Sequence, residues 1–351
     1  MQQGHQHHQQ PQRRRDGALR AATGAHARAA EPRRPLNDEH QPDQHARNAA
    51  HAHRAYGIAG LVALLVFGVA APAWAADEAP QALTVGFAIL LGAIQGATEF
   101  LPVSSSGHLS LGQAWLGIDP ESAGHRFNIV LHAGTLIAVL WVYRDDVFKL
   151  LRVLTKPAED TADRRRLLMM LLASVPLGIV LAPAVEGLVV SMEGEVRLVG
   201  VALLVTAAIL FFAFRDGRGD GDGGEEPPTA KQAIIIGLCQ VLAVLPGISR
   251  SGTTIAAGLA VGLDRARAAR FSFLISLIAV GGASAKEVLD VLGDDAAVGA
   301  IPLVPFVAGF VASLVVGLLS LRGLLYLVGK GRVQGFVVYL VLMGCIAIAV
   351  G

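Results

Sequence analysis

Long apolar segments separated by short charged stretches fill the chain from about residue 81 onward. A membrane-spanning helix needs about 20 mostly apolar residues. Six segments approach or meet that length, namely residues 127–143, 167–185, 196–214, 271–289, 303–328 and 333–350. This pattern predicts an all-α polytopic membrane protein.

Two further apolar segments, 83–101 and 232–245, are interrupted by proline and by a cluster of serine and glycine, and each is followed by a short second apolar run. We expect each of them to form a re-entrant helix-break-helix hairpin. Non-helical backbone is tolerated at membrane depth only where it is buried in protein or lines a wet cavity. The two breaks are therefore the expected place for a buried site.

The two interrupted segments are related by a shift of 145 positions, from Gly92 to Gly237. The shift superposes Gln95, Ser104, Ser106 and Gly107 on Gln240, Ser249, Ser251 and Gly252. Three charged or titratable residues, Glu99, His108 and Arg250, have no equivalent in the other copy. The pattern predicts a duplication whose halves have divided the charged chemistry between them.

Charge predicts the orientation of the halves. The expected loop at residues 144–166 carries seven Lys or Arg, whereas the next expected loop, residues 186–195, carries three Glu and neither Lys nor Arg. The positive-inside rule makes the first stretch cytoplasmic. Three spans then separate the two hairpins, so the hairpins enter the membrane from opposite sides. This predicts an inverted-topology repeat in which each half is a re-entrant hairpin plus three transmembrane helices. The broken tips are expected near the membrane midplane.

The domain organisation has three parts. Residues 1–55 are rich in His, Arg and Gln and predict a disordered tail. Residues 56–80 form a signal-like or anchoring hydrophobic segment, whose cleavage the sequence leaves open. Residues 81–351 form a membrane catalytic domain, with repeat 1 at about 83–215 and repeat 2 at about 231–351.

Composition limits the classes of partner. Hydrophobic residues make up 53% of the chain, charged residues 16%, and the net charge is +1. Because the basic residues do not form one face, we expect no nucleic-acid partner, and we expect the protein to lie in a lipid bilayer. Both cysteines lie in apolar stretches, which disfavours a disulfide.

The first break supplies candidates for acid-base and nucleophilic chemistry. Glu99 is ionisable at membrane depth, which is costly without a partner. Ser104, Ser105 and Ser106 precede His108, which could transfer protons. Helix capping is the alternative role for the serines. His125 and His132 lack such neighbours in the sequence, and we expect them to be structural.

The second break supplies Arg250, whose planar guanidinium matches phosphate oxygens in two-point contact. A structural ion pair with Glu99 is the alternative. Free amides at the two helix N-termini would also bind an anion. The expected binding set is Gln95, Ser104, Ser106, Gly107, Ser249, Ser251, Gly252, Thr253 and Thr254.

The stretches EFLPVSSSGHL, from Glu99, and PGISRSGTT, from Pro246, resemble the undecaprenyl-diphosphatases of the bacitracin-resistance type over residues 83–351. The resemblance implies hydrolysis of undecaprenyl diphosphate to the monophosphate and phosphate, which recycles the lipid carrier for peptidoglycan. It also implies a location in the bacterial cytoplasmic membrane with the site open to the outer face. A divalent cation, Mg²⁺ or Ca²⁺, is implied too, with Glu99 as its expected ligand and Gln95 where many relatives have a second carboxylate.

Several alternatives stay open at this level. Either Ser105 attacks phosphorus or it positions a water, and either His108 or Glu99 takes the proton. Broken helices in an inverted repeat are also typical of transporters, so a polyprenyl-phosphate flippase is the second function, and a structural membrane subunit the third. A homodimer is left open.

Overall fold

The computed structural model describes residues 82–118, 125–156, 161–180, 195–214, 224–292 and 302–351, together with residues 189 and 192. All of them belong to the unit of residues 51–351. Three predicted features lie outside the described residues: the tail (1–55), the hydrophobic segment (56–80) and positions 181–185 of one expected span.

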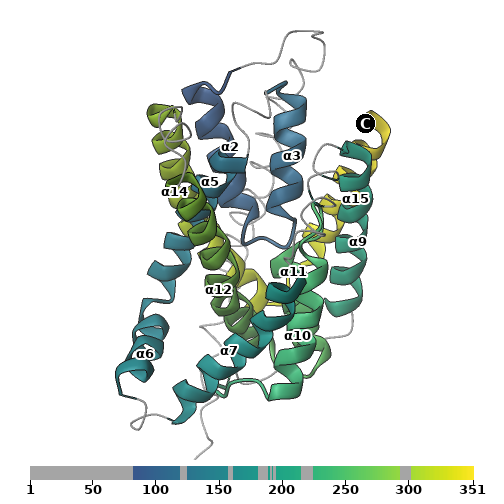
Figure 1. The fold of residues 1–351 in the computed structure, drawn as a ribbon. Coiled ribbons are helices and arrows are strands. Elements are labelled where there is room, and N and C mark those ends of the chain that lie inside the picture. Colours follow the sequence, from purple (N-terminus) through teal and green to yellow (C-terminus); the bar gives the residue numbers. More distant parts are fainter. Residues whose placement is uncertain are drawn as a thin grey trace, which may run out of the picture. The chain divides into compact units, whose positions relative to one another are not determined.

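The described part of the chain contains eleven helices and is all-α (Figure 1). They are α2 (Val85–Thr98), α3 (Ser105–Trp115), α5 (His125–Val142), α6 (Arg144–Thr155), α7 (Thr161–Val180), α9 (Val196–Phe214), α10 (Ala230–Leu242), α11 (Arg250–Ala260), α12 (Arg265–Leu292), α14 (Leu303–Gly329) and α15 (Gln334–Val350).

The two interrupted segments fold alike. Each consists of a helix, a short break and a second helix. The helices of the two copies begin at positions 145 residues apart: Val85 corresponds to Ala230, and Ser105 to Arg250. Ser104 and Ser249 cap α3 and α11 by accepting from the amides of Gly107 and Gly252. The predicted helix-break-helix motif is therefore present in both copies.

The duplicated halves exchange partners. α2 packs mainly against α14, while its counterpart α10 packs mainly against α7. Both contacts are close, because a Cβ at Gly96 would lie 2.6 Å from the backbone oxygen of Ser313 on α14, and a Cβ at Gly237 would lie even closer to that of Ala173 on α7. The hydroxyl of Ser320 on α14 also donates to the backbone oxygen of Ala97 at 2.8 Å and fixes the end of α2.

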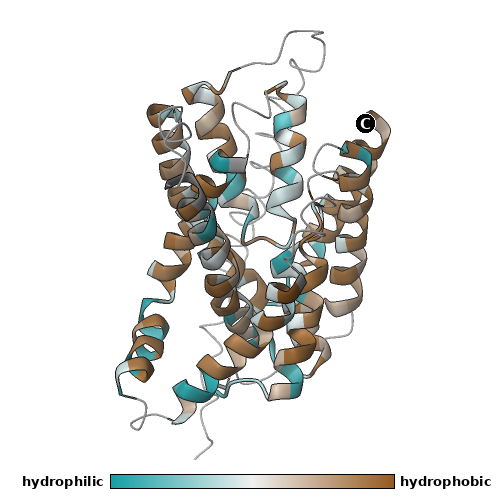
Figure 2. Cartoon of the chain, viewed as in Figure 1, coloured by the Kyte–Doolittle hydropathy of each residue, from teal (hydrophilic) through white to brown (hydrophobic). Residues whose placement is uncertain are grey.

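The chain is a multi-pass membrane protein. Among the described residues, three helices are long and apolar enough to cross a membrane alone: Val196–Phe214, Arg265–Lys286 and Leu303–Gly329. Residues 126–142 and 144–155 pass the same test as a pair, bent by 85° at Tyr143. In Figure 2, hydrophobic residues (brown) make up most of the length of these helices.

The charged stretch after residue 143, which we treated as a loop, contains the helix α6. Asp145 and Asp146 occupy its first turn and Arg152 its last, which suits the helix dipole. Its apolar residues recur with a helical period, which explains why it folds as a helix despite its charge. Phe148 and Leu154 remain exposed on it.

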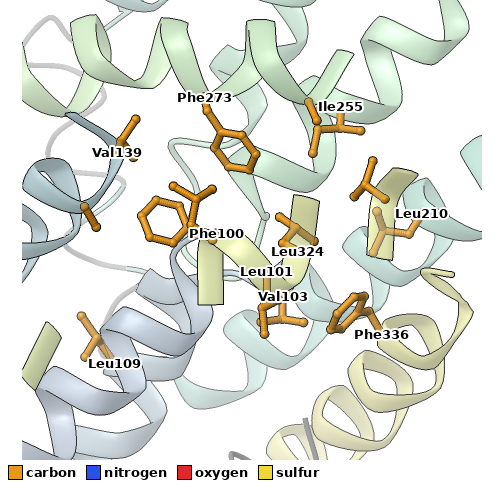
Figure 3. Packing of buried hydrophobic residues seen from close by; sticks show 14 of the residues in the cluster. Phe100, Leu101, Val103, Leu109, Val139, Leu210, Ile255, Phe273, Leu324 and Phe336 are labelled. Carbon is orange, nitrogen blue, oxygen red and sulfur yellow. The ribbon is translucent and has the colours of Figure 1, made fainter. Parts of the chain in front are cut away.

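Apolar side chains anchor the first break in the core. Phe100, Leu101 and Val103 are all buried (Figure 3). The ring of Phe100 meets that of Phe273 on α12 edge to face, with centroids 5.9 Å apart. Because these side chains fix the break, the polar residues on either side of it have defined positions.

Candidate active site

The two breaks contact one another directly. Nη2 of Arg250 donates to Oε1 of Glu99, so the one charged residue of the second motif binds the carboxylate of the first. A Cβ at Gly107 would lie 3.0 Å from Cα of Gly247, which shows that the two backbones touch where both residues are glycine. The tertiary structure thus joins the two motifs into one site.

Four side chains surround the carboxylate of Glu99, which is only 8% exposed. Besides Arg250 on Oε1, Oε2 accepts from the hydroxyl of Ser105 at 2.5 Å and from Nε2 of Gln95 at 3.0 Å. Nε2 of His132 lies 3.7 Å from the same oxygen. Because the Ser105 hydroxyl already donates to Oε2, this carboxylate is placed to accept the Ser105 proton.

Ser104 adopts a left-handed backbone conformation, with φ of 70°, which is uncommon for a residue other than glycine. Its backbone oxygen lies 2.8 Å from Nδ1 of His108. A carbonyl oxygen only accepts, so Nδ1 donates, and Nε2 of the neutral ring accepts from the hydroxyl of Tyr339 at 2.6 Å. Both ring nitrogens of His108 are therefore engaged in holding the start of α3.

The second break is held by α9. Thr206 donates to the backbone oxygen of Gly247 at 2.9 Å and accepts from the amide of Ser249 at 3.1 Å. Thr254 donates to the backbone oxygen of Arg250 at 2.8 Å, so it supports the helix start instead of facing a ligand. These contacts fix the position from which Arg250 reaches Glu99.

A cavity of about 290 Å³ lies against both breaks. Six predicted site residues line it: Glu99, Ser104, Ser105, Ser106, Ser249 and Arg250. The described wall of the cavity does not include Gln95, Gly107, His108, Ser251, Gly252, Thr253 or Thr254. Part of the wall is apolar, with contributions from Leu177 of α7 and Val280 of α12.

Several polar residues of the wall were absent from the predicted site, among them His132, Asn128 and Gln240. His132 and Asn128 come from α5, and His132 was expected to be structural. Gln240 of α10 is fully buried, and among the residues that the structure describes neither atom of its amide has a hydrogen-bond partner. The sequence contained one signal for Gln240, because the shift superposes it on Gln95.

Comparison with known proteins identifies the family. The family model described as "Bacitracin resistance protein BacA" matches residues 88–346. The chain belongs to this family. Three similar proteins are a Methanosphaera stadtmanae undecaprenyl-diphosphatase (37% identical, covering 74% of this chain and 96% of the relative), one from Bacteroides fragilis (36%, 75% and 97%), and undecaprenyl-diphosphatase 1 of Bacillus licheniformis (38%, 73% and 94%).

The site of this BacA-family chain offers few ligands for a divalent cation. Within the described residues no group of three or more His, Cys, Asp or Glu could hold a metal ion. The amide oxygen of Gln95 is nevertheless buried and has no hydrogen-bond partner in that part of the chain, and it lies on the side chain that donates to Glu99. One carboxylate and one amide oxygen suit Mg²⁺ or Ca²⁺ only when phosphate oxygens complete the ligand set.

Proposed function

We propose that this protein hydrolyses undecaprenyl diphosphate to undecaprenyl phosphate and phosphate, and so recycles the lipid carrier for peptidoglycan synthesis and confers resistance to bacitracin. One observation carries the proposal. The hydroxyl of Ser105 lies 2.5 Å from Oε2 of Glu99, while Arg250 binds the other oxygen, and all three line one cavity. A nucleophile, a base and a cation are thus assembled beside an apolar wall.

In the proposed reaction, Oγ of Ser105 attacks the terminal phosphorus and its proton passes to Glu99. The bond from that phosphorus to the bridging oxygen breaks, and its electron pair stays on undecaprenyl phosphate. A water then attacks the phosphorus of the phosphoserine and the P–Oγ bond breaks. Glu99 returns its proton to Oγ of Ser105, and both hydrogens of the water leave with the phosphate. Between the two proton acceptors considered from sequence, the contacts favour Glu99, because both nitrogens of His108 already have partners.

Charge on the diphosphate is balanced by Arg250 and by the helix N-termini of α3 and α11. Both helices begin at the cavity, at Ser105 and Arg250. The first amides of a helix have no acceptor within it, and they favour anions. Such preorganised donors stabilise the charge that develops as the P–O bond breaks.

A divalent cation that arrives with the diphosphate would be held by Glu99 and Oε1 of Gln95. It would supply additional positive charge to the phosphate oxygens. This role rests on the unpartnered amide oxygen of Gln95 beside a carboxylate. Gln95 would therefore contribute to cation binding instead of contacting phosphate.

We further propose that the two halves form an inverted-topology repeat in the bacterial cytoplasmic membrane, with the site open to the outer face. The exchanged pairing of α2 with α14 and of α10 with α7 supports it, as does the spread of the hairpins in Figure 1, with α2 and α3 in its upper half and α10 in its lower half. The excess of Lys and Arg in residues 144–166 supports a cytoplasmic position for α6.

The deciding experiment measures phosphate release from undecaprenyl diphosphate by the purified protein in detergent with Mg²⁺ or Ca²⁺. We expect release by the wild type and loss of release in Arg250→Lys, which keeps the charge but not the planar fork. The exchanged helix pairs also suit a polyprenyl-phosphate flippase. Absence of phosphate release by a folded wild type, together with movement of labelled lipid in vesicles, would establish the flippase instead.

A further inference from the structure

Gln240 is a polar side chain without a structural explanation. Gln240 is fully buried on α10 and lines the cavity. Neither Nε2 nor Oε1 has a hydrogen-bond partner among the residues described. Burying an amide without partners is unfavourable, so we expect a ligand to supply the partners of one that lines a cavity.

A second unpartnered donor lines the same cavity. Nη2 of Arg250 is bound to Glu99, whereas Nη1 is buried and has no partner within the described part of the chain. The amide of Gln240 can donate two hydrogen bonds, and Nη1 adds further N–H groups. Together they form a set of donors suited to the oxygens of an anion.

The position of Gln240 indicates which part of the substrate it meets. Ala243 and Val244 lie in the turn that directly follows α10, and both line the cavity together with Gln240. Leu177 continues this apolar wall. Gln240 thus shares the cavity with Ser105 and Glu99, and the two wall residues that follow it in the chain are apolar.

We propose that Gln240, together with Nη1 of Arg250, binds the phosphate that remains on the lipid after cleavage. This assignment rests on the proposed diphosphatase function. In a diphosphate ester the terminal phosphate must lie at Ser105, and the other phosphate is the one joined to the prenyl chain. A donor pair next to the apolar wall meets that second phosphate, and the amide oxygen of Gln240 accepts from a water of its hydration shell.

The experiment compares the wild type with Gln240→Met, Gln240→Glu and the control Gln334→Met, which changes an exposed glutamine at the start of α15. Kinetics with undecaprenyl diphosphate are measured alongside the unfolding midpoint. Hydrogen bonds to a charged group are worth about 1.5–3 kcal/mol, so Gln240→Met should raise KM by roughly tenfold to a hundredfold with kcat within a few-fold. Gln240→Glu, which places a carboxylate against the phosphate, should raise KM further, and the control should match the wild type.

Two more readouts separate ligand binding from a structural role. The free Gln240→Met protein should unfold at or above the wild-type midpoint, because an unpartnered buried amide has been removed. Undecaprenyl phosphate should raise the midpoint of the wild type but much less that of Gln240→Met, whereas inorganic phosphate should protect both equally.

The proposal is overturned if KM in both Gln240 variants stays within twofold of the wild type, or if undecaprenyl phosphate protects Gln240→Met as well as the wild type. A lower unfolding midpoint with a parallel fall in kcat at constant KM would also overturn it, since that marks a packing residue. Failure of the proposed function is distinguishable, because the wild type itself would then release no phosphate.

Discussion

Arg250 donates to the carboxylate of Glu99 across 151 positions of sequence, and this contact makes one site of two motifs. Both side chains are largely buried, at 16% and 6% exposure. Removing one partner of a buried pair leaves an uncompensated charge, at a cost of about 3–5 kcal/mol.

We therefore expect Arg250→Ala to be strongly destabilised, with a lower unfolding midpoint in detergent. The double variant Glu99→Gln with Arg250→Met should recover most of that stability, because no charge is left unpaired, but no activity. A double variant as unstable as Arg250→Ala would contradict the pairing as the source of the effect.

Glu99→Gln keeps an amide oxygen that can still accept from Arg250, so the variant should fold with a lowered unfolding midpoint. Its folded fraction should release phosphate about 10²–10⁴-fold more slowly, because an amide cannot take the Ser105 proton. Asp145→Asn is the matched control: this carboxylate lies on α6 with its side chain 83% exposed and should leave the rate unchanged. Equal rates in wild type and Glu99→Gln would exclude Glu99 as the base.

Ser105→Ala should abolish the reaction if its hydroxyl attacks phosphorus, and a phosphoserine should be trapped in the wild type by rapid quenching. Ser174→Ala, which removes a hydroxyl bonded to the backbone oxygen of Met170, serves as the control and should remain active. In a single turnover, ¹⁸O passing directly from water into phosphate by an active Ser105→Ala protein would exclude the covalent route.

Gly107→Ala should destabilise the protein by about 1–3 kcal/mol, since its Cβ would press on the backbone of Gly247 and separate the two breaks. Activity should fall with it, because Ser105 and Arg250 would move apart. Gly178→Ala on α7 is the control: apart from its own helix backbone, no atom of the described residues lies within 4 Å of the added Cβ, so we expect no loss of stability. Similar midpoints for the two variants would contradict close contact between the breaks.

Chelation of divalent cations should abolish activity, and added Mg²⁺ or Ca²⁺ should restore it. Gln95→Glu adds a carboxylate beside Glu99 and should lower the cation concentration required for half-maximal activity, whereas Gln95→Met should raise it. Activity that persists in excess chelator would remove the cation from the reaction.

Much of the architecture was predictable because it depends on local pattern. The shift of 145 positions, seen at Gly92 and Gly237, anticipated the equivalent starts of α2 with α10 and of α3 with α11. Apolar length predicted the spans that coincide with α9, α12 and α14. The helix α6 was missed, because its charges were interpreted as a loop although its apolar residues recur with a helical period.

The sequence by itself determined that the chain is helical and membrane-embedded and that its interrupted segment occurs twice, because apolar length and a repeat can be read along the chain. It also predicted Glu99, Ser105 and Arg250 as candidates for the chemistry, because these residues interrupt apolar segments. Only the tertiary structure decided which side chains face the cavity. It placed His132 and Gln240 in the wall of the cavity, and it showed that the two ring nitrogens of His108 are hydrogen-bonded to Ser104 and Tyr339. The direction of a side chain depends on how helices far apart in sequence pack against one another, and spacing along the chain does not contain that information.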